Sequence, residues 1–258
     1  MNLNMDADIA ASYSSSSQRI RVITENWAAL NLFCPYCGNE YVRHFENNRP
    51  VADFYCPKCK EEYELKSKDG NIMSKINDGA YSTMLERIES VNNPNFFFLQ
   101  YAKQNMNVKN LLMVPKYFFL PEVIEKRKPL AATARRAGWV GCNILLEKIP
   151  YEGRIFIIKD EKEQPVDEVI EKVNRTAFIR KYKLDTRGWI LDILNCINLI
   201  DGKNFSLEQI YAFEEMLASK YPNNHHIKDK IRQQLQVLRD KGFIEFNGRG
   251  HYSKIILR

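Results

Sequence analysis

The chain has 258 residues, of which 45% are hydrophobic, and a formal net charge of +6 at pH 7. This length allows one large domain or two small ones, and the mild basic excess permits a nucleic-acid partner without requiring one. There is no run of about 18 apolar residues, and the polar, acidic start differs from a secretory signal. We therefore expect no membrane span and no export, but a cytoplasmic protein whose thiols stay reduced.

The N-terminal part of the chain predicts an α/β domain. Apolar residues at Ile20, Ile23, Trp27 and Leu30 have helical spacing. Short stretches rich in aromatic and β-branched residues indicate a hairpin, and longer apolar runs are typical of central strands buried on both faces. The predicted elements are a helix over 18–33, hairpin strands at 50–56 and 61–67, a helix over 73–91, central strands at 95–101, 110–115 and 153–160, and a charged helix over 160–183.

Two CxxC pairs are typical of a zinc site. Cys34 and Cys37 are separated by 18 residues from Cys56 and Cys59. This spacing is found in four-thiolate zinc ribbons. The alternative is two disulfides, which a reducing compartment disfavours. We therefore predict a structural Zn²⁺ ion held by these four thiolates.

From residue 183 the pattern changes to three amphipathic helices and a final hairpin. Ser206 followed by Gln209 is a capping-box pattern that marks the start of the second helix. The helices are expected over 186–200, 206–217 and 224–242, and the hairpin over 243–256. Three helices and a terminal hairpin describe a winged-helix module. We therefore divide the chain into a domain at 1–182 and a winged-helix domain at 183–258.

Basic charge is concentrated at the end of this module. Residues 225–258 carry eight Lys/Arg and three Asp/Glu, whereas residues 183–224 carry four and six. The third predicted helix has one apolar face and one polar face, and Arg and Gln are side chains that read guanine and adenine edges. The candidate DNA contacts are His226, Arg232, Gln233, Gln236 and, in the hairpin turn, Arg249. The alternative is a solvated face of a protein-interaction module.

Two acids and a lysine lie around the second CxxC pair. Asp53 falls on the first hairpin strand, and Glu64, Leu65 and Lys66 fall on the second. Alternation points Glu64 and Lys66 the same way, and antiparallel pairing can bring Asp53 alongside them. The two carboxylates and the Leu65 carbonyl would bind Mg²⁺, which activates water and stabilises charge on a phosphate, while Lys66 would orient that water or neutralise the phosphate.

Taken alone, this acid–lysine pattern is weak evidence for a metal site. The alternative is that these residues form a charged strand edge exposed to solvent. In an α/β domain joined to a winged helix, however, it is the layout of a nuclease. The zinc site would then fix the hairpin that positions the carboxylates. A zinc-ribbon and winged-helix transcription regulator, which only binds DNA, is the competing hypothesis. Such a regulator has no use for Asp53, Glu64 and Lys66.

Several long and unusual stretches carry a resemblance to a known family. They include HFENNRPVADFYC, EEYELKSK, NNPNFFFL, RKPLAATARRAGWVGCN and EFNGRG. Through them the chain resembles the DpnI-type methyl-directed restriction endonucleases along nearly its whole length. The resemblance implies a PD-(D/E)xK catalytic domain with the embedded zinc ribbon, followed by a winged helix. It implies Mg²⁺-dependent cleavage of both strands of GATC sites that carry 6-methyladenine.

The resemblance also assigns residues. It carries the catalytic triplet to Asp53, Glu64 and Lys66, the zinc thiolates to the four cysteines above, and the methyl-sensing tryptophan to Trp139. We expect a monomer that acts on methylated double-stranded DNA in a bacterial cytoplasm.

Reading a methyl group requires an apolar surface, because a methyl makes no new hydrogen bond. Trp139 offers such a surface, and the neighbouring Arg135 and Arg136 can hold phosphate or guanine. Trp189 is a second large apolar face. Core packing is the alternative for both tryptophans, and it is the stronger alternative for Trp189, which falls on an amphipathic helix.

Overall fold

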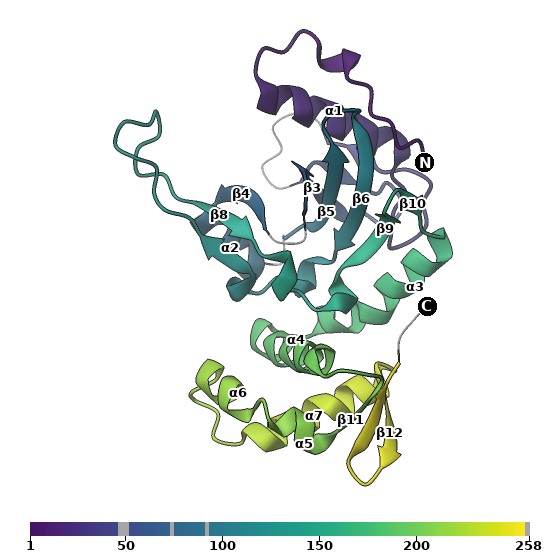
Figure 1. The fold of residues 1–258 in the computed structure, drawn as a ribbon, viewed down its shortest axis with the longest axis vertical. Coiled ribbons are helices and arrows are strands. Elements are labelled where there is room, and N and C mark those ends of the chain that lie inside the picture. The colour runs from purple at the N-terminus through teal and green to yellow at the C-terminus, as the bar shows by residue number, and fades with distance from the viewer. Residues whose placement is uncertain (46–51, 73–74, 91–92, 256–258) are drawn as a thin grey trace. The chain divides into compact units, whose positions relative to one another are not determined.

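The computed structural model describes residues 1–45, 52–72, 75–90 and 93–255. The chain divides into two compact units, Met1–Ala177 and Phe178–Arg258 (Figure 1). Among the described residues, every helix is too short or too polar to cross a membrane.

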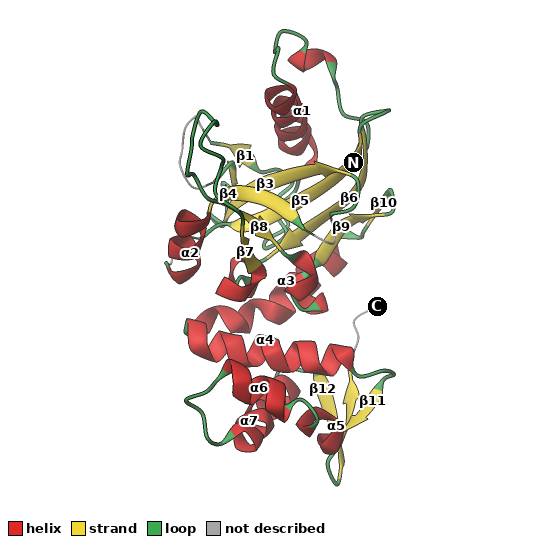
Figure 2. Cartoon of the chain, turned by 60° about the vertical axis from the view of Figure 1, so that its left-hand side comes forward, coloured by secondary structure: helices red, strands yellow, loops and turns green. Residues whose placement is uncertain are grey.

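The first unit is built on a mixed sheet. Within the described residues its strands follow the order β1-β2-β3-β5-β6-β9-β10 (Figure 2). The pair β3 and β5 is parallel, and the other neighbours are antiparallel. The strands are β1 (Arg43–His44), β2 (Phe54–Tyr55), β3 (Glu62–Asp69), β5 (Asn95–Ala102), β6 (Asn107–Val114), β9 (Ile155–Lys159) and β10 (Lys162–Glu163).

A parallel pair needs a long crossover connection, and the one between β3 and β5 carries β4 (Ile76–Ala80) and α2 (Tyr81–Glu89). A second sheet has the order β4-β8-β7, in which β7 is Ile124–Lys126 and β8 is Gly141–Ile144. The remaining α-helices described in the first unit are α1 (Ser16–Asn31) and α3 (Val166–Thr176).

The main hydrophobic core lies against one face of the large sheet. Phe97 of β5 points to this face, where α1 contributes Trp27 and α3 contributes Val173. Because neighbouring side chains of a strand point to opposite faces, Phe96 points away from this core, and its ring lies 4.8 Å from that of Phe119. Strand β5 is therefore buried on both sides, as its apolar sequence predicts.

Two predicted helices are wrong in part. The helix expected over 73–91 begins in the described residues as β4, and only its second half is α2; residues 73–74 and 91 lie outside the described part. Pairing of β4 with β8 outweighs a helical tendency that Gly79 already weakens. In the charged segment 160–183, Asp160 and Glu161 have positive φ and form a turn. The helix α3 therefore begins only after Pro165.

The second unit has the helices and the final hairpin of a winged-helix module. It contains α4 (Leu184–Leu199), α5 (Leu207–Tyr211), α6 (Glu214–Lys220), α7 (Ile227–Asp240), β11 (Asn204–Ser206), β12 (Ile244–Gly248) and β13 (His251–Lys254). The strand order is β11-β13-β12. The capping box of Ser206 and Gln209 is present, but the helix expected over 206–217 is divided into α5 and α6. Position 256 of the predicted hairpin lies outside the described residues.

Two details of this unit bear on the DNA-contact predictions. Arg249 and Gly250 both have positive φ, as a tight two-residue turn between β12 and β13 requires, and this presents Arg249 at the tip of the hairpin. Trp189 is 2% exposed and its ring stacks on Tyr221 with centroids 3.9 Å apart. Trp189 is thus a core residue, as the core-packing alternative predicts, and it does not offer an apolar face to DNA.

Candidate metal centre and acidic site

The two CxxC pairs lie on two loops with the same local structure. In each loop the residue four positions after the first cysteine donates its N–H to that cysteine's carbonyl, which is Gly38 to Cys34 at 2.9 Å and Lys60 to Cys56 at 3.0 Å. Gly38 and Lys60 also share a positive φ, 70° and 64°. Each loop therefore turns sharply after its second cysteine, and the two thiols of a pair face the same point.

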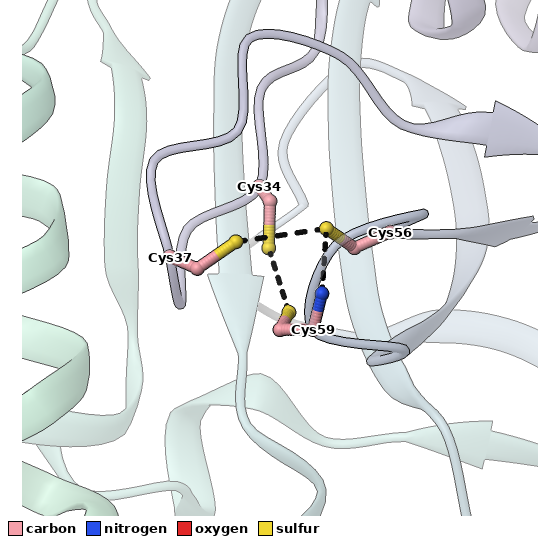
Figure 3. A group of neighbouring side chains, drawn as sticks. All are labelled: Cys34, Cys37, Cys56 and Cys59. Atoms are coloured by element: carbon pink, nitrogen blue, oxygen red, sulfur yellow. Dashed lines mark hydrogen bonds between the residues drawn. The ribbon is translucent and has the colours of Figure 1, made fainter.

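The four sulfur atoms converge on one point between the loops (Figure 3). They belong to Cys34, Cys37, Cys56 and Cys59, and all lie within 4.8 Å of one another. All four cysteines are free, with sulfur–sulfur distances of 3.5 Å and 3.6 Å for the two closest pairs. A tetrahedral site with Zn–S bonds of about 2.3 Å has S–S edges of about 3.8 Å. The cluster therefore has the composition and nearly the size that such an ion requires.

The pKa values of the cluster thiols shift in different directions. At Cys56 burial is outweighed by backbone hydrogen bonds from Cys59 and Lys58, which lower the pKa. Burial raises the pKa of Cys34, and it raises the pKa of Cys59 to about 11. Without a cation these two groups would remain neutral thiols at neutral pH. A metal ion offsets the cost of ionising buried thiols, because thiolate is the form that binds it.

Tyr63 connects the cysteine cluster to the acidic site. Its hydroxyl lies 3.1 Å from Cys34 Sγ, and its buried ring stacks on Phe97 at 4.6 Å. Its carbonyl accepts the N–H of Asp53 at 2.9 Å. One residue thus touches a cluster sulfur with its side chain and holds Asp53 with its backbone.

Asp53 lies beside Glu64 through the pairing of β2 with β3. These strands are antiparallel with Phe54 opposite Tyr63, and Asp53 immediately precedes β2. Leu65 N–H donates to Asp53 Oδ2 at 2.8 Å, which holds the carboxylate against the backbone on the C-terminal side of Glu64. The predicted antiparallel pairing is confirmed. Asp53 itself lies just before the strand, and positions 50–51 of the predicted strand lie outside the described residues.

Glu64 and Lys66 point to the same face of β3, as alternation predicts, with Lys66 Nζ 2.6 Å from Glu64 Oε1. Two further residues complete the group. Asp78 of β4 places Oδ1 at 2.5 Å from Lys66 Nζ, and Arg87 of α2 places Nη1 at 3.0 Å from Glu64 Oε2. Each oxygen of Glu64 therefore contacts a cation, and the Lys66 ammonium lies between two carboxylates.

The pKa values of two carboxyl groups at this site, those of Asp53 and Glu64, are raised, chiefly by burial. Burial raises the pKa of Asp53, and the charge of Glu25 adds to it. Burial also raises the pKa of Glu64; Lys66 opposes this and Asp78 adds to it. Burial lowers the pKa of Lys66, but Glu64 and Asp78 outweigh it, so the net shift is upward and the ammonium stays charged. Carboxylates that resist ionisation without a further cation are suited to a divalent ion such as Mg²⁺.

Three predicted DNA contacts lie on one extended arm. The arm, residues 127–140, connects β7 to β8, and Leu130 N–H donates to Trp139 O at 2.9 Å across it (Figure 1). It carries four basic residues and no acid. Arg135 and Arg136 are exposed, and Trp139 is half-buried.

Trp139 is a half-buried residue held in place by two contacts. The guanidinium carbon of Arg136 lies 4.4 Å from the ring centre. The ring also packs on Gly141, where a Cβ would come within 2.7 Å of it. The core alternative therefore does not apply to Trp139.

The remaining predicted contacts are exposed in the second unit. Arg232, Gln233 and Gln236 are exposed on α7, whereas the apolar residues Ile227, Ile231, Leu235 and Leu238 of that helix are buried. The His226 side chain, just before α7, is 83% exposed, and Arg249 is exposed at the hairpin tip. Part of this set borders an open hollow at the start of α7, lined by Asn224, His226, Asp229, Lys230 and Gln233.

Sequence reasoning misses Asp78, Arg87 and Tyr63. The predicted helix over 73–91 conceals Asp78, and the one signal against that helix is Gly79 at its centre. No local pattern indicates that Arg87 or Tyr63 reaches the site, because their contacts come from strand pairing and helix packing.

An α/β unit with a strand-borne acid–lysine group and a cysteine cluster that could hold a metal ion, in one chain with a helix-turn-helix unit, is the arrangement expected of a two-part enzyme that acts on DNA. Residues 1–182 match the family model DpnI, described as the Dam-replacing family, and residues 185–254 match DpnI_C, the Dam-replacing HTH domain. The chain therefore belongs to the DpnI, or Dam-replacing, family. Membership implies a methyl-dependent restriction endonuclease.

Proposed function

We propose that this protein is a type II restriction endonuclease that cleaves both strands of GATC sites containing 6-methyladenine, by Mg²⁺-dependent phosphodiester hydrolysis. Residues 1–182 would form the catalytic domain, of the PD-(D/E)xK class, and residues 183–258 the winged-helix domain. The observation that carries the proposal is the hydrogen bond from Leu65 N–H to Asp53, next to the ion pair of Glu64 with Lys66, in the part of the chain that matches the DpnI family model.

The proposed roles follow from the charges and positions of these residues. Asp53, Glu64 and the Leu65 carbonyl would hold Mg²⁺, whose chemistry is to lower the pKa of water and stabilise charge on the scissile phosphate. Lys66 carries a permanent positive charge beside them, so it can orient the attacking water by hydrogen bonding and neutralise the phosphate. Leu65 N–H fixes the orientation of Asp53 before substrate arrives.

Zn²⁺ would have a structural role at the four-cysteine cluster. All four positions are protein thiols, so no coordination position remains open for a substrate. The second CxxC loop joins β2 directly to β3, the strand pair that places Asp53 beside Glu64. Closing that loop around a metal would hold the pair in register.

Selectivity would come from both units. Trp139 offers an apolar face on a basic arm, which suits contact with adenine methyl groups, while Arg135 and Arg136 would hold phosphate or guanine. His226, Arg232, Gln233, Gln236 and Arg249 would contact the same short site from the second unit. One methyl discriminates by only about 1–3 kcal/mol, so two units that both examine the site would multiply a modest preference.

The test uses four synthetic duplexes of otherwise equal sequence. Their GATC site carries 6-methyladenine on both strands, on one strand or on neither, and in the fourth the methylated adenines lie in a scrambled tetranucleotide. We expect cleavage of the doubly methylated site with Mg²⁺ and none with EDTA. Binding of methylated GATC without any cleavage would instead support a DNA-binding regulator, and equal cleavage of all four would refute site and methyl specificity.

A further inference from the structure

Asp78 approaches the candidate site from a different sheet. It lies on β4, which pairs with β8 and not with the strands that carry Asp53, Glu64 and Lys66. Its side chain is only 4% exposed, and its Oδ1 lies 2.5 Å from Lys66 Nζ. A buried carboxylate is costly unless it is paired, and here the described partner is the ammonium of the proposed catalytic lysine.

Two of the three N–H donors of the Lys66 ammonium have carboxylate partners. An ammonium has three N–H donors, and two are directed at Glu64 Oε1, at 2.6 Å, and at Asp78 Oδ1, at 2.5 Å. The third remains for water or a phosphate oxygen. Two anchors on different elements fix the direction of that third donor, whereas one anchor would let the flexible side chain rotate.

Glu64 cannot serve as a constant anchor if it also binds a cation. Its other oxygen already contacts Arg87 at 3.0 Å, so both oxygens have partners before any metal arrives. A divalent ion on Glu64 would compete with Lys66 for the same carboxylate and would repel the ammonium. Asp78 lies on β4, apart from the strand pair that carries Asp53 and Glu64. Its contact with the Lys66 ammonium would therefore persist when Glu64 binds the ion.

We propose that Asp78 is the positioning residue for Lys66: it holds the ammonium at the reaction centre when Glu64 is engaged by Mg²⁺, and is not itself a metal ligand. The inference rests on the proposed nuclease function. It concerns the rate of the chemical step and not the affinity for DNA or for Mg²⁺.

The experiment measures single-turnover cleavage of doubly methylated duplex by the full-length protein, as a function of enzyme and Mg²⁺ concentration. Asp78→Asn keeps the shape and removes the charge, and Asp78→Glu keeps the charge. We expect Asp78→Asn to lower the rate at saturation by about 100-fold, the size of effect that misplacing a catalytic group produces. Asp78→Glu should recover part of that loss. The half-saturating concentrations of enzyme and Mg²⁺ should stay within threefold of wild type.

Asp192→Asn is the matched control. It removes the same charge from another poorly exposed ion pair, in which Lys220 Nζ lies 2.5 Å from Asp192 Oδ1 in the second unit. It should lower the melting temperature as Asp78→Asn does, while leaving the rate at saturating enzyme unchanged. A second readout avoids activity: the rise in melting temperature caused by Mg²⁺ should be retained in Asp78→Asn.

Several results would overturn the inference. A rate for Asp78→Asn equal to wild type would remove any role in positioning Lys66. A rise of tenfold or more in half-saturating Mg²⁺, or loss of the Mg²⁺-induced melting shift, would make Asp78 a metal ligand. If Asp78→Asn does not fold, Asp78→Glu decides the question: a rate at saturation below that of wild type, with unchanged half-saturating Mg²⁺, would support the role, and a wild-type rate or a raised Mg²⁺ demand would refute it. A wild-type protein that does not cut methylated GATC would refute the proposed function itself.

Discussion

Leu65 N–H donates to Asp53 Oδ2 at 2.8 Å, which joins a carboxylate at the start of β2 to the backbone of β3. The bond holds the Asp53 side chain against the backbone of β3, at the residue that follows Glu64. It uses one lone pair of Oδ2, while Arg21 Nη2 lies 3.7 Å from Asp53 Oδ1. Since Asp53 N–H is held by Tyr63 O at 2.9 Å, both the backbone and the side chain of Asp53 are fixed by β3.

Asp53→Ala and Lys66→Ala should each lower cleavage of methylated GATC by about 100-fold or more while leaving DNA binding largely intact. The reason is that these groups would serve the chemical step, whereas the winged helix would supply much of the affinity. Single-turnover cleavage and fluorescence anisotropy measure the two effects. Asp69→Asn, an exposed acid at the end of the same strand, is the control and should cut normally. Parallel losses of binding and cutting would contradict the assignment.

Cys56→Ser, or removal of zinc by a chelator, should lower the melting temperature of the first unit by about 10 °C, roughly 3–5 kcal/mol for a domain of this size. Added Mg²⁺ should not restore it, because a hard cation does not replace a thiolate-bound ion. Differential scanning calorimetry with metal analysis tests this. Cys196→Ser, at a buried cysteine outside the cluster, should keep the full metal content. A folded and active protein without metal would refute the structural role.

Tyr63→Phe should speed the release of zinc to a competing chelator, because it removes the hydroxyl 3.1 Å from Cys34 Sγ but keeps the ring against Phe97. Losing such an outer contact costs about 10–100-fold in metal affinity. Tyr36→Phe is the control, since its hydroxyl binds Asn95 Oδ1 at 2.9 Å and not a sulfur. Equal release rates for the two variants would show that the Tyr63 contact does not hold the cluster.

The isolated second unit should fold and bind DNA with a steep dependence on salt. Four phosphate contacts would give a log–log slope of about −3.6 and a loss of about 150-fold between about 50 and 200 mM salt. A fragment starting at Phe178 should melt higher than one starting at 183, because the Phe178 ring lies 5.7 Å from that of Phe243. Affinity that does not change with salt would show that the basic charge of this unit does not contact DNA.

Trp139→Ala should reduce the ratio of cleavage rates on methylated and unmethylated GATC by about 10-fold, within the roughly 10–200-fold that one methyl-sized contact provides. Gly141→Ala tests the same surface differently, because its Cβ would displace the Trp139 ring without removing it. Leu130→Ala on the same arm is the control and should leave the ratio unchanged. If the ratio is unchanged in a folded Trp139→Ala, the methyl is read elsewhere, and the winged helix is the next place to examine.

The sequence by itself determined the features that depend on local spacing. The two CxxC pairs predict a four-sulfur cluster because each pair closes its own short loop, and those loops are found with the same hydrogen bonds. Period-two alternation places Glu64 and Lys66 on one face, and the helical period predicts the buried face of α7. The long apolar runs predict the buried strands β5, β6 and β9 because only the interior of a sheet can accommodate them.

Only the tertiary structure decided how distant segments complete these local features. Asp78 reaches Lys66 because β4 pairs with β8, a partner more than 60 residues away that no local pattern reveals. The same pairing turns the first half of a predicted helix into a strand. The tertiary structure also decided which tryptophan is a core residue. Trp189 stacks inside its unit, whereas Trp139 stays at the surface on an extended arm. Periodicity reports which face of an element is apolar, but the partner that covers that face is chosen by packing of the whole chain.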